Sequence, residues 1–121
     1  MRFPLGLGDH RQPIEEMRAI GVRTILRIGS CGALQSGMSV GDLIISTGSV
    51  RDDGTTSTYV DKGYPAVPDL ETTGILQQVC GKMGFRYHSG ITRSHDSYYA
   101  DTAEERTDYW HSRGILGEDL E

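Results

Sequence analysis

The sequence predicts an α/β fold with a mixed, largely parallel sheet flanked by helices. Helix-like and strand-like segments alternate along the 121 residues, which is typical of this class. The segment at residues 23–28 has a continuous apolar centre instead of an alternating pattern, as expected for a strand covered on both faces. The length allows one domain, so residues 1–121 are treated as a single unit.

The first half of the chain is predicted to contain one helix and two strands. Residues 13–20 form the helix, with Pro13 near its start and Gly21 as its stop. Residues 23–28 form the first strand, and a Gly/Ser-rich loop leads to the second strand at residues 43–47. The two strands therefore flank a glycine-rich connection.

The second half alternates in the same way after a long polar loop at residues 51–68. A loop of that length is usually functional or disordered. Residues 69–83 form a helix, with Asp69 as its N-cap and Gly84 as its stop. The remaining predicted elements are a strand at 85–92, a polar helix at 102–113 and a strand that begins at 115–116.

Composition excludes several classes of protein. The net charge is −5 and the mean hydropathy is −0.40, and no basic stripe with interleaved aromatic residues is present, so nucleic-acid binding is not expected. No apolar run has the length of a membrane span, and the first residues lack the apolar centre of a signal peptide. Cys31 and Cys80 form no CxxC pair and no metal-ligand spacing with histidine, which favours a reduced, cytoplasmic protein without a metal site.

The strongest candidate site is the turn Arg27-Ile28-Gly29-Ser30-Cys31-Gly32 after the first strand. Backbone N–H groups and the Ser30 hydroxyl can meet an anion at such a turn. Arg27 adds a planar, permanently charged fork that suits two phosphate oxygens. The alternative is a tight turn in which Arg27 pairs with a nearby carboxylate. Polar clusters at 94–99 and 117–121 also follow predicted strands, where sites of α/β sheets gather.

Other candidate residues favour structural roles. His95 and Asp96 invite an acid/base interpretation, but a histidine hydrogen-bonded to its neighbour at a strand end is more common. Ser30 does not fit the G-x-S-x-G nucleophile turn, because Ile28 stands where that turn needs glycine. Cys31 is disfavoured as a covalent nucleophile. The segment at 51–54 has too few oxygen ligands for a metal loop.

Four separated motifs resemble the nucleoside phosphorylase family, the hexameric type that includes uridine phosphorylase and bacterial purine nucleoside phosphorylase. They are RTILRIGSCGALQSGMSVGDLIISTGSVRDDGT, YPAVPDLE, GITRSHDSYYAD and GILGEDLE. The resemblance implies a phosphorylase-like fold and phosphorolysis, in which phosphate attacks the anomeric carbon of the ribose. It also implies a cytoplasmic homo-oligomer that needs no cofactor besides phosphate as co-substrate.

The resemblance assigns roles to individual residues. Arg27 and Ser30 correspond to phosphate ligands, and Cys31 and Gly32 would line the floor beneath sugar and base. Tyr98 stands where the family places an aromatic near the base or sugar. Asp119-Leu120-Glu121 replaces the family's Glu-Met-Glu, whose second glutamate accepts hydrogen bonds from the ribose hydroxyls.

The departures from the family leave alternatives open. Family members are roughly twice this length, so the chain is expected to be a truncated central fragment, a partial domain. RDDGT and YPAVPD favour uridine, yet residues 99–113 lack the Gln and Arg pair that reads uracil and resemble the purine enzymes in their shortness. A nucleosidase of the same fold is disfavoured by Arg27, because water needs no cation there. A non-catalytic fragment with a residual phosphate site is the third possibility.

Overall fold

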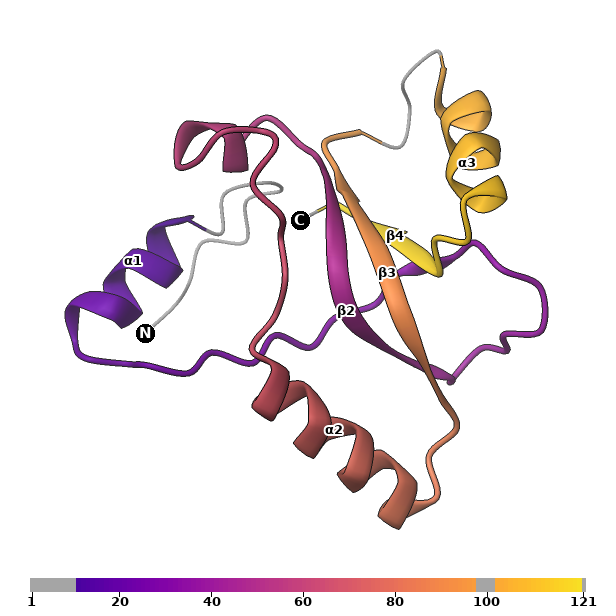
Figure 1. The fold of residues 1–121 in the computed structure, drawn as a ribbon, viewed down its shortest axis with the longest axis horizontal. Helices are drawn as coiled ribbons and strands as arrows, with labels where there is room; N and C mark the ends of the chain where they lie inside the picture. Colours follow the sequence, from indigo (N-terminus) through magenta and orange to yellow (C-terminus); the bar gives the residue numbers. More distant parts are fainter. Residues whose placement is uncertain (1–10, 98–101, 121) are drawn as a thin grey trace.

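The computed structural model describes residues 11–97 and 102–120 of the chain, and Figure 1 shows the arrangement of its elements. In chain order they are α1 (Arg11–Ala19), β1 (Gly32–Ala33), β2 (Leu43–Asp52), the 3-10 helix η1 (Thr56–Thr58), α2 (Leu70–Met83), β3 (Tyr87–His95), α3 (Ala103–Ser112) and β4 (Gly117–Asp119). The strands form one sheet in the order β1-β4-β3-β2. The predicted α/β class is confirmed.

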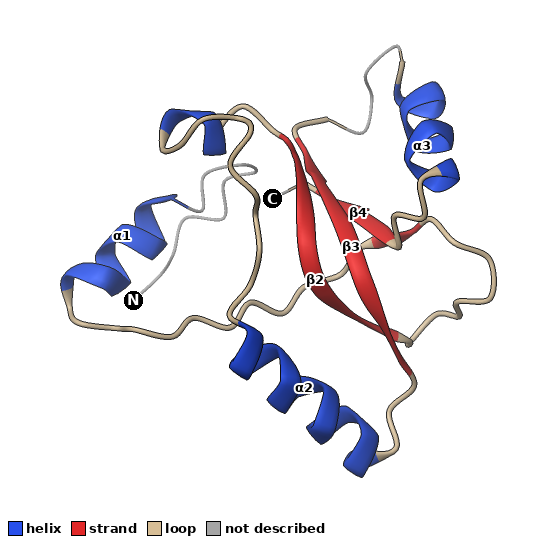
Figure 2. Cartoon of the chain, viewed as in Figure 1, coloured by secondary structure: helices blue, strands red, loops and turns tan. Residues whose placement is uncertain are grey.

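The sheet is mixed and largely parallel, as predicted. β3 runs parallel to both β2 and β4, and β1 pairs antiparallel with β4. β2 and β3 form the longest ladder, from Leu43 opposite Tyr87 to Asp52 opposite His95 (Figure 2). Both strands extend further than predicted at their carboxyl ends, so the charged residues there lie within the sheet and not in a loop.

α2 confirms the helix predicted at residues 69–83. The Asp69 carboxylate accepts a hydrogen bond from the Thr72 N–H at 2.8 Å, which satisfies one of the helix's open donors. Gly84 ends the helix with φ of 73°, a left-handed conformation that glycine adopts without strain. α2 packs against β2 and β3, and the buried apolar side chains of the described chain are Ile45, Cys80 and Ile115.

The strand predicted at residues 23–28 is wrong. These residues follow α1 and the Gly21 turn, and the structure assigns them neither to a strand nor to a helix. Their apolar side chains are solvent-exposed, with Leu26 at 50% and Ile28 at 85%. A strand exists only when a neighbouring backbone completes its hydrogen bonds, and no described segment pairs with this one.

The loop that follows β2 is held in place by Arg51. Its Nη1 donates to the carbonyls of Asp61 at 2.6 Å and Tyr64 at 2.7 Å, and its Nη2 donates to the carbonyl of Val60 at 2.9 Å. One guanidinium thus binds three backbone carbonyls, which would otherwise need hydrogen bonds from water. Among the described helices, none has the length and apolar character needed to cross a membrane.

Candidate functional site

Arg27 lies at the end of β4, where its Nη2 is 3.5 Å from Oδ2 of Asp119. The two residues are 92 positions apart, and the antiparallel pairing of Gly32 with Glu118 brings their segments together. The Arg27 side chain is 51% exposed and that of Asp119 is 26% exposed. An exposed pair of this kind adds only about 0–1 kcal/mol to stability. The turn thus presents a half-exposed guanidinium beside a partly exposed carboxylate.

Glycines let the backbone approach closely at this point. A Cβ on Gly29 would lie 2.7 Å from Nη2 of Arg27, so the guanidinium folds back over the Gly29 backbone. A Cβ on Gly117 would lie 2.9 Å from the Gly32 carbonyl and 3.4 Å from Sγ of Cys31. The glycine-rich turn predicted to bind an anion is thus packed tightly between its own arginine and β4.

The charges of Arg27 and Asp119 both act on the thiol of Cys31. Burial of its thiol raises the pKa of Cys31, and the negative charge of Asp119 raises it further, while Arg27 acts in the opposite direction. The net effect keeps the thiol protonated at neutral pH. A protonated thiol is a poor nucleophile, and the lining role of Cys31 stays a prediction.

The structure brings together four of the predicted site residues, which are Arg27, Cys31, Gly32 and Asp119. Ser30 lies in the same turn and is exposed. Leu120 follows Asp119, and its N–H donates to Oδ1 of that carboxylate at 2.8 Å. Tyr98 and Glu121 lie outside the described residues.

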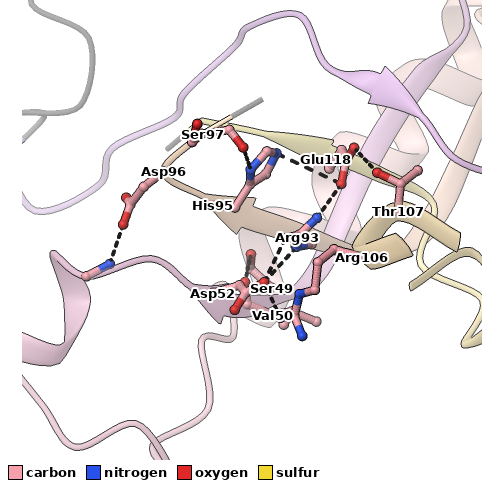
Figure 3. A network of polar contacts seen from close by, with 11 residues as sticks. Ser49, Val50, Asp52, Arg93, His95, Asp96, Ser97, Arg106, Thr107 and Glu118 are labelled. Carbon is pink, nitrogen blue, oxygen red and sulfur yellow. Dashed lines mark hydrogen bonds and ion pairs between the residues drawn. The ribbon is translucent and has the colours of Figure 1, made fainter. Parts of the chain in front are cut away.

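A second polar cluster lies at the carboxyl ends of the parallel strands, centred on Arg93 (Figure 3). Arg93 is 7% exposed. Its Nε and Nη2 donate to Oδ2 of Asp52 at 3.0 and 2.7 Å, and its Nη1 donates to Oε2 of Glu118 at 2.7 Å. Arg106 of α3 donates to the same Asp52 oxygen at 2.6 Å. One network therefore joins β2, β3, β4 and α3.

Arg106 and Arg93 stabilise the ionised form of Asp52. Partial burial on its own raises the pKa of Asp52, but hydrogen bonds and charges from Arg106 and Arg93 outweigh it and hold the pKa below its usual value. Two guanidinium groups balance the carboxylates of Asp52 and Glu118, so the cluster carries no net charge.

A cavity of about 170 Å³ lies between this network and α3. It is lined by Arg93, His95, Ser97, Ala103, Arg106, Thr107 and Glu118. The Thr107 hydroxyl donates to Oε1 of Glu118 at 3.1 Å. The Trp110 ring lies beside the cluster, with the Arg106 guanidinium carbon 5.6 Å from its centroid. The cavity wall is thus rich in fixed donors and acceptors.

The adjacent pair His95 and Asp96 makes two different contacts. Nδ1 of His95 lies 3.0 Å from the Ser97 carbonyl, which can only accept, so this nitrogen carries the proton. Asp96 accepts from the Gly54 N–H at 2.9 Å and so links the loop after β2 to the end of β3. The local hydrogen bond of His95 thus goes to Ser97, two residues further on, and not to the adjacent Asp96.

Sequence reasoning missed Arg93, Asp52, Arg106 and Glu118 as a unit. The available signal was that Asp52, Arg93 and Glu118 each follow a predicted strand within a few residues, where polar groups of α/β sheets gather. Within residues 11–97 and 102–120, no group of three or more His, Cys, Asp or Glu side chains could hold a metal ion.

Comparison with known proteins places these features in context. Residues 5–119 match the family model of the phosphorylase superfamily. Uridine phosphorylase from Thermococcus kodakarensis is 52% identical over 86 residues, which cover 71% of this chain and 31% of that protein. Guanosine phosphorylase from Halorubrum lacusprofundi is 36% identical over 108 residues, covering 89% of this chain and 44% of that protein.

Solved structures show the same likeness in three dimensions. The crystal structure of uridine phosphorylase from Vibrio fischeri ES114 matches with a TM-score of 0.87 and 35% identity. The match covers 90% of this chain and 46% of that chain. The chain therefore spans less than half the length of these relatives.

Proposed function

Since the chain belongs to the phosphorylase superfamily, we propose that it carries the phosphate- and ribose-binding part of a nucleoside phosphorylase. Such an enzyme breaks the bond between base and ribose, forms a bond from a phosphate oxygen to the anomeric carbon, and releases free base and ribose 1-phosphate. The base leaves with the electron pair of the broken bond and takes up a proton. Uridine is the favoured nucleoside.

The observation that carries this proposal is the position of Arg27 over Gly29 beside Asp119. A half-exposed guanidinium at a glycine turn offers several N–H donors to phosphate oxygens. A carboxylate next to it can accept hydrogen bonds from sugar hydroxyls. Phosphate is a weak nucleophile and the transition state carries positive charge on the sugar, so positioning and charge complementarity dominate such a reaction.

The remaining assignments rest on the same proposal. We assign Ser30 to the phosphate, Cys31, Gly32 and Leu120 to the floor of the site, Tyr98 to the base, and Glu121 to the ribose hydroxyls. A cytoplasmic homo-oligomer is the proposed assembly. Uridine phosphorylases among the similar proteins support the choice of uridine, and the guanosine phosphorylase supports a purine nucleoside as the second candidate.

Phosphate is expected to raise the unfolding temperature of the chain, and Arg27→Ala is expected to abolish that rise. A ligand bound to the native state at ten times its Kd adds about 1.4 kcal/mol to the free energy of unfolding. Differential scanning fluorimetry with and without millimolar phosphate measures the shift. Arg23→Ala is the matched control, because Arg23 is an exposed arginine of the same segment. An equal phosphate shift in Arg27→Ala and in the unaltered chain would contradict the proposed site.

Gly29→Ala is expected to weaken phosphate binding with little change in stability. The added methyl would meet the mobile end of the Arg27 side chain, which can swing away at small cost but then leaves the turn. Isothermal titration calorimetry with phosphate measures the affinity. Gly63→Ala is the control, because a Cβ there meets nothing within 4 Å. Unchanged phosphate affinity in Gly29→Ala would show that the folded-back position of Arg27 is not the binding position.

A further inference from the structure

The strand β4 connects the buried Arg93 network to the Arg27 turn through two consecutive carboxylates. Glu118 and Asp119 are neighbours in this strand, so their side chains leave its opposite faces. Glu118 is 8% exposed and belongs to the network, whereas Oδ2 of Asp119 lies 3.5 Å from Nη2 of Arg27 on the other side. The contacts that fix Glu118 therefore also affect where Asp119 lies.

The register of β4 is fixed by a short ladder. Its three residues, Gly117–Asp119, pair with three residues of β3, and two of them pair with β1. A slip by one residue moves every side chain of a strand to the opposite face. If β4 slipped so that Asp119 took the place of Glu118, Leu120 would take the place of Asp119. The Arg27 turn would then face an apolar side chain and lose its carboxylate.

The side-chain contacts of Glu118 distinguish the two registers (Figure 3). Arg93 lies opposite Glu118 in the ladder, and its Nη1 donates to Oε2 at 2.7 Å. The Thr107 hydroxyl of α3 donates to Oε1 at 3.1 Å, so one carboxylate joins β3 to α3. Aspartate is shorter by one methylene. In the slipped register, Asp119 would not reach both donors without a further shift of the strand.

We propose that Arg93 and Thr107 are positioning residues, which set the register of β4 through Glu118 and so hold Asp119 beside Arg27. Both act from the face of β4 opposite the proposed site, so neither contacts a substrate. The role of Asp119 toward the sugar rests on the proposed function. Its position beside Arg27 can be tested without phosphate or nucleoside.

Cys31 reports the position of Asp119. Burial raises the pKa of the Cys31 thiol most, and the charge of Asp119 raises it further. Because the thiolate is the reactive form, loss of this charge moves the pH profile of alkylation to lower pH. Asp119→Asn gives the size of that shift. Cys31 is exposed and Cys80 is buried, so the reactivity of Cys80 reports unfolding in the same sample.

The experiment measures iodoacetamide labelling of each cysteine against pH by mass spectrometry of tryptic peptides. Glu118→Leu accepts no hydrogen bond from Arg93 or Thr107, and its Cys31 profile is expected to shift toward that of Asp119→Asn while Cys80 stays protected. Glu118→Gln is the matched control. Its amide oxygen can accept from Arg93 and its amide nitrogen can donate to the Thr107 hydroxyl, so the profile of the unaltered chain is expected.

Thr107 is tested by a second pair of variants. Thr107→Val removes the hydroxyl that donates to Glu118, and a smaller shift of the Cys31 profile in the same direction is expected. Thr107→Ser keeps the hydroxyl and should keep the profile of the unaltered chain. If Cys80 becomes reactive in Glu118→Leu, that variant has unfolded and this pair decides. A shift in Thr107→Val alone then supports the proposal, and equal profiles overturn it.

The results separate this proposal from the proposed function. An unchanged Cys31 profile in Glu118→Leu with Cys80 protected overturns the positioning role. An equal shift in Glu118→Gln also overturns it, because loss of the Glu118 charge would then explain the effect. If the expected shifts occur but phosphate does not stabilise the chain, the positioning role stands and the proposed function fails. If phosphate stabilises the chain through Arg27 without these shifts, the proposed function stands alone.

Discussion

Replacement of Arg93 by methionine is expected to lower the free energy of unfolding by about 3–5 kcal/mol. Arg93 is 7% exposed and joins Asp52 of β2 to Glu118 of β4. Methionine fills much of the space but leaves the Glu118 carboxylate buried beside an apolar side chain. An uncompensated buried charge is costly because it loses water without gaining a partner. Urea denaturation followed by circular dichroism measures the loss.

Two further variants separate the effect of an unpaired buried charge from the effect of losing any arginine. Arg113→Met removes an exposed arginine that stacks on Tyr109, and it is expected to cost less than about 1 kcal/mol. The double variant Arg93→Met/Glu118→Leu is expected to recover much of the lost stability, because no buried charge remains without a partner. If the double variant loses as much stability as the two single variants added together, the unpaired buried charge is not the cause of the loss in Arg93→Met.

The same network predicts how the stability of the chain responds to acid. The folded-state pKa of Asp52 is lowered, so its contribution is fully present above the unfolded value near 3.8 and is lost as the pH falls through the folded pKa. Arg93→Met removes one of the two arginines that lower this pKa. The acid-induced loss of stability below about pH 4 is therefore expected to be smaller in the variant than in the unaltered chain.

Gly117→Ala is expected to separate β1 from β4 and to abolish the effect of phosphate on stability. The added Cβ would lie 2.9 Å from the Gly32 carbonyl and 2.9 Å from Cδ1 of Ile44. Because one of these atoms belongs to the backbone, the contact cannot be relieved by a side-chain rotation. Overpacking of this kind costs about 1–3 kcal/mol, and it acts where Arg27 meets Asp119. Thermal unfolding with and without phosphate measures both effects.

Gly74→Ala is the matched control for this substitution. Gly74 lies inside α2, and a Cβ there meets nothing within 4 Å. Alanine is favoured over glycine in a helix by about 0.5–1 kcal/mol, so the variant should be more stable and retain its response to phosphate. If Gly117→Ala behaved like Gly74→Ala, the tight contact of β1 with β4 would have no energetic role.

Local signals predicted the helices well and the sheet only in part. α2 was predictable from Asp69 and Gly84 because both end signals act on the backbone of the helix itself. The apolar segment at 23–28 carries the composition of a strand, but a strand also needs a partner, and composition says nothing about partners. The predicted Arg27 turn does lie at a sheet end, although no strand precedes it from residue 11 onward.

The polar network shows a second limit of sequence reasoning. Arg93 is 41 residues from Asp52 and 25 residues from Glu118, and nothing in the local pattern connects them. Their contact follows from the parallel register, which places Asp52 opposite His95 and Arg93 opposite Glu118. Register is a property of paired strands, so neither the network nor the cavity beside it could be derived from single segments.

The pairing of β1 with β4 also makes the proposed phosphate site a reporter of complete folding. Arg27 and Asp119 are 92 residues apart, and closing a chain loop of that length costs about 4 kcal/mol of entropy. The hydrogen bonds of the short β1–β4 ladder do not offset this entropic cost on their own. The ladder is therefore expected to form only after β2, β3 and β4 have assembled. Phosphate binding should therefore appear as the last step of refolding, later than the packing of Trp110 beside Arg93.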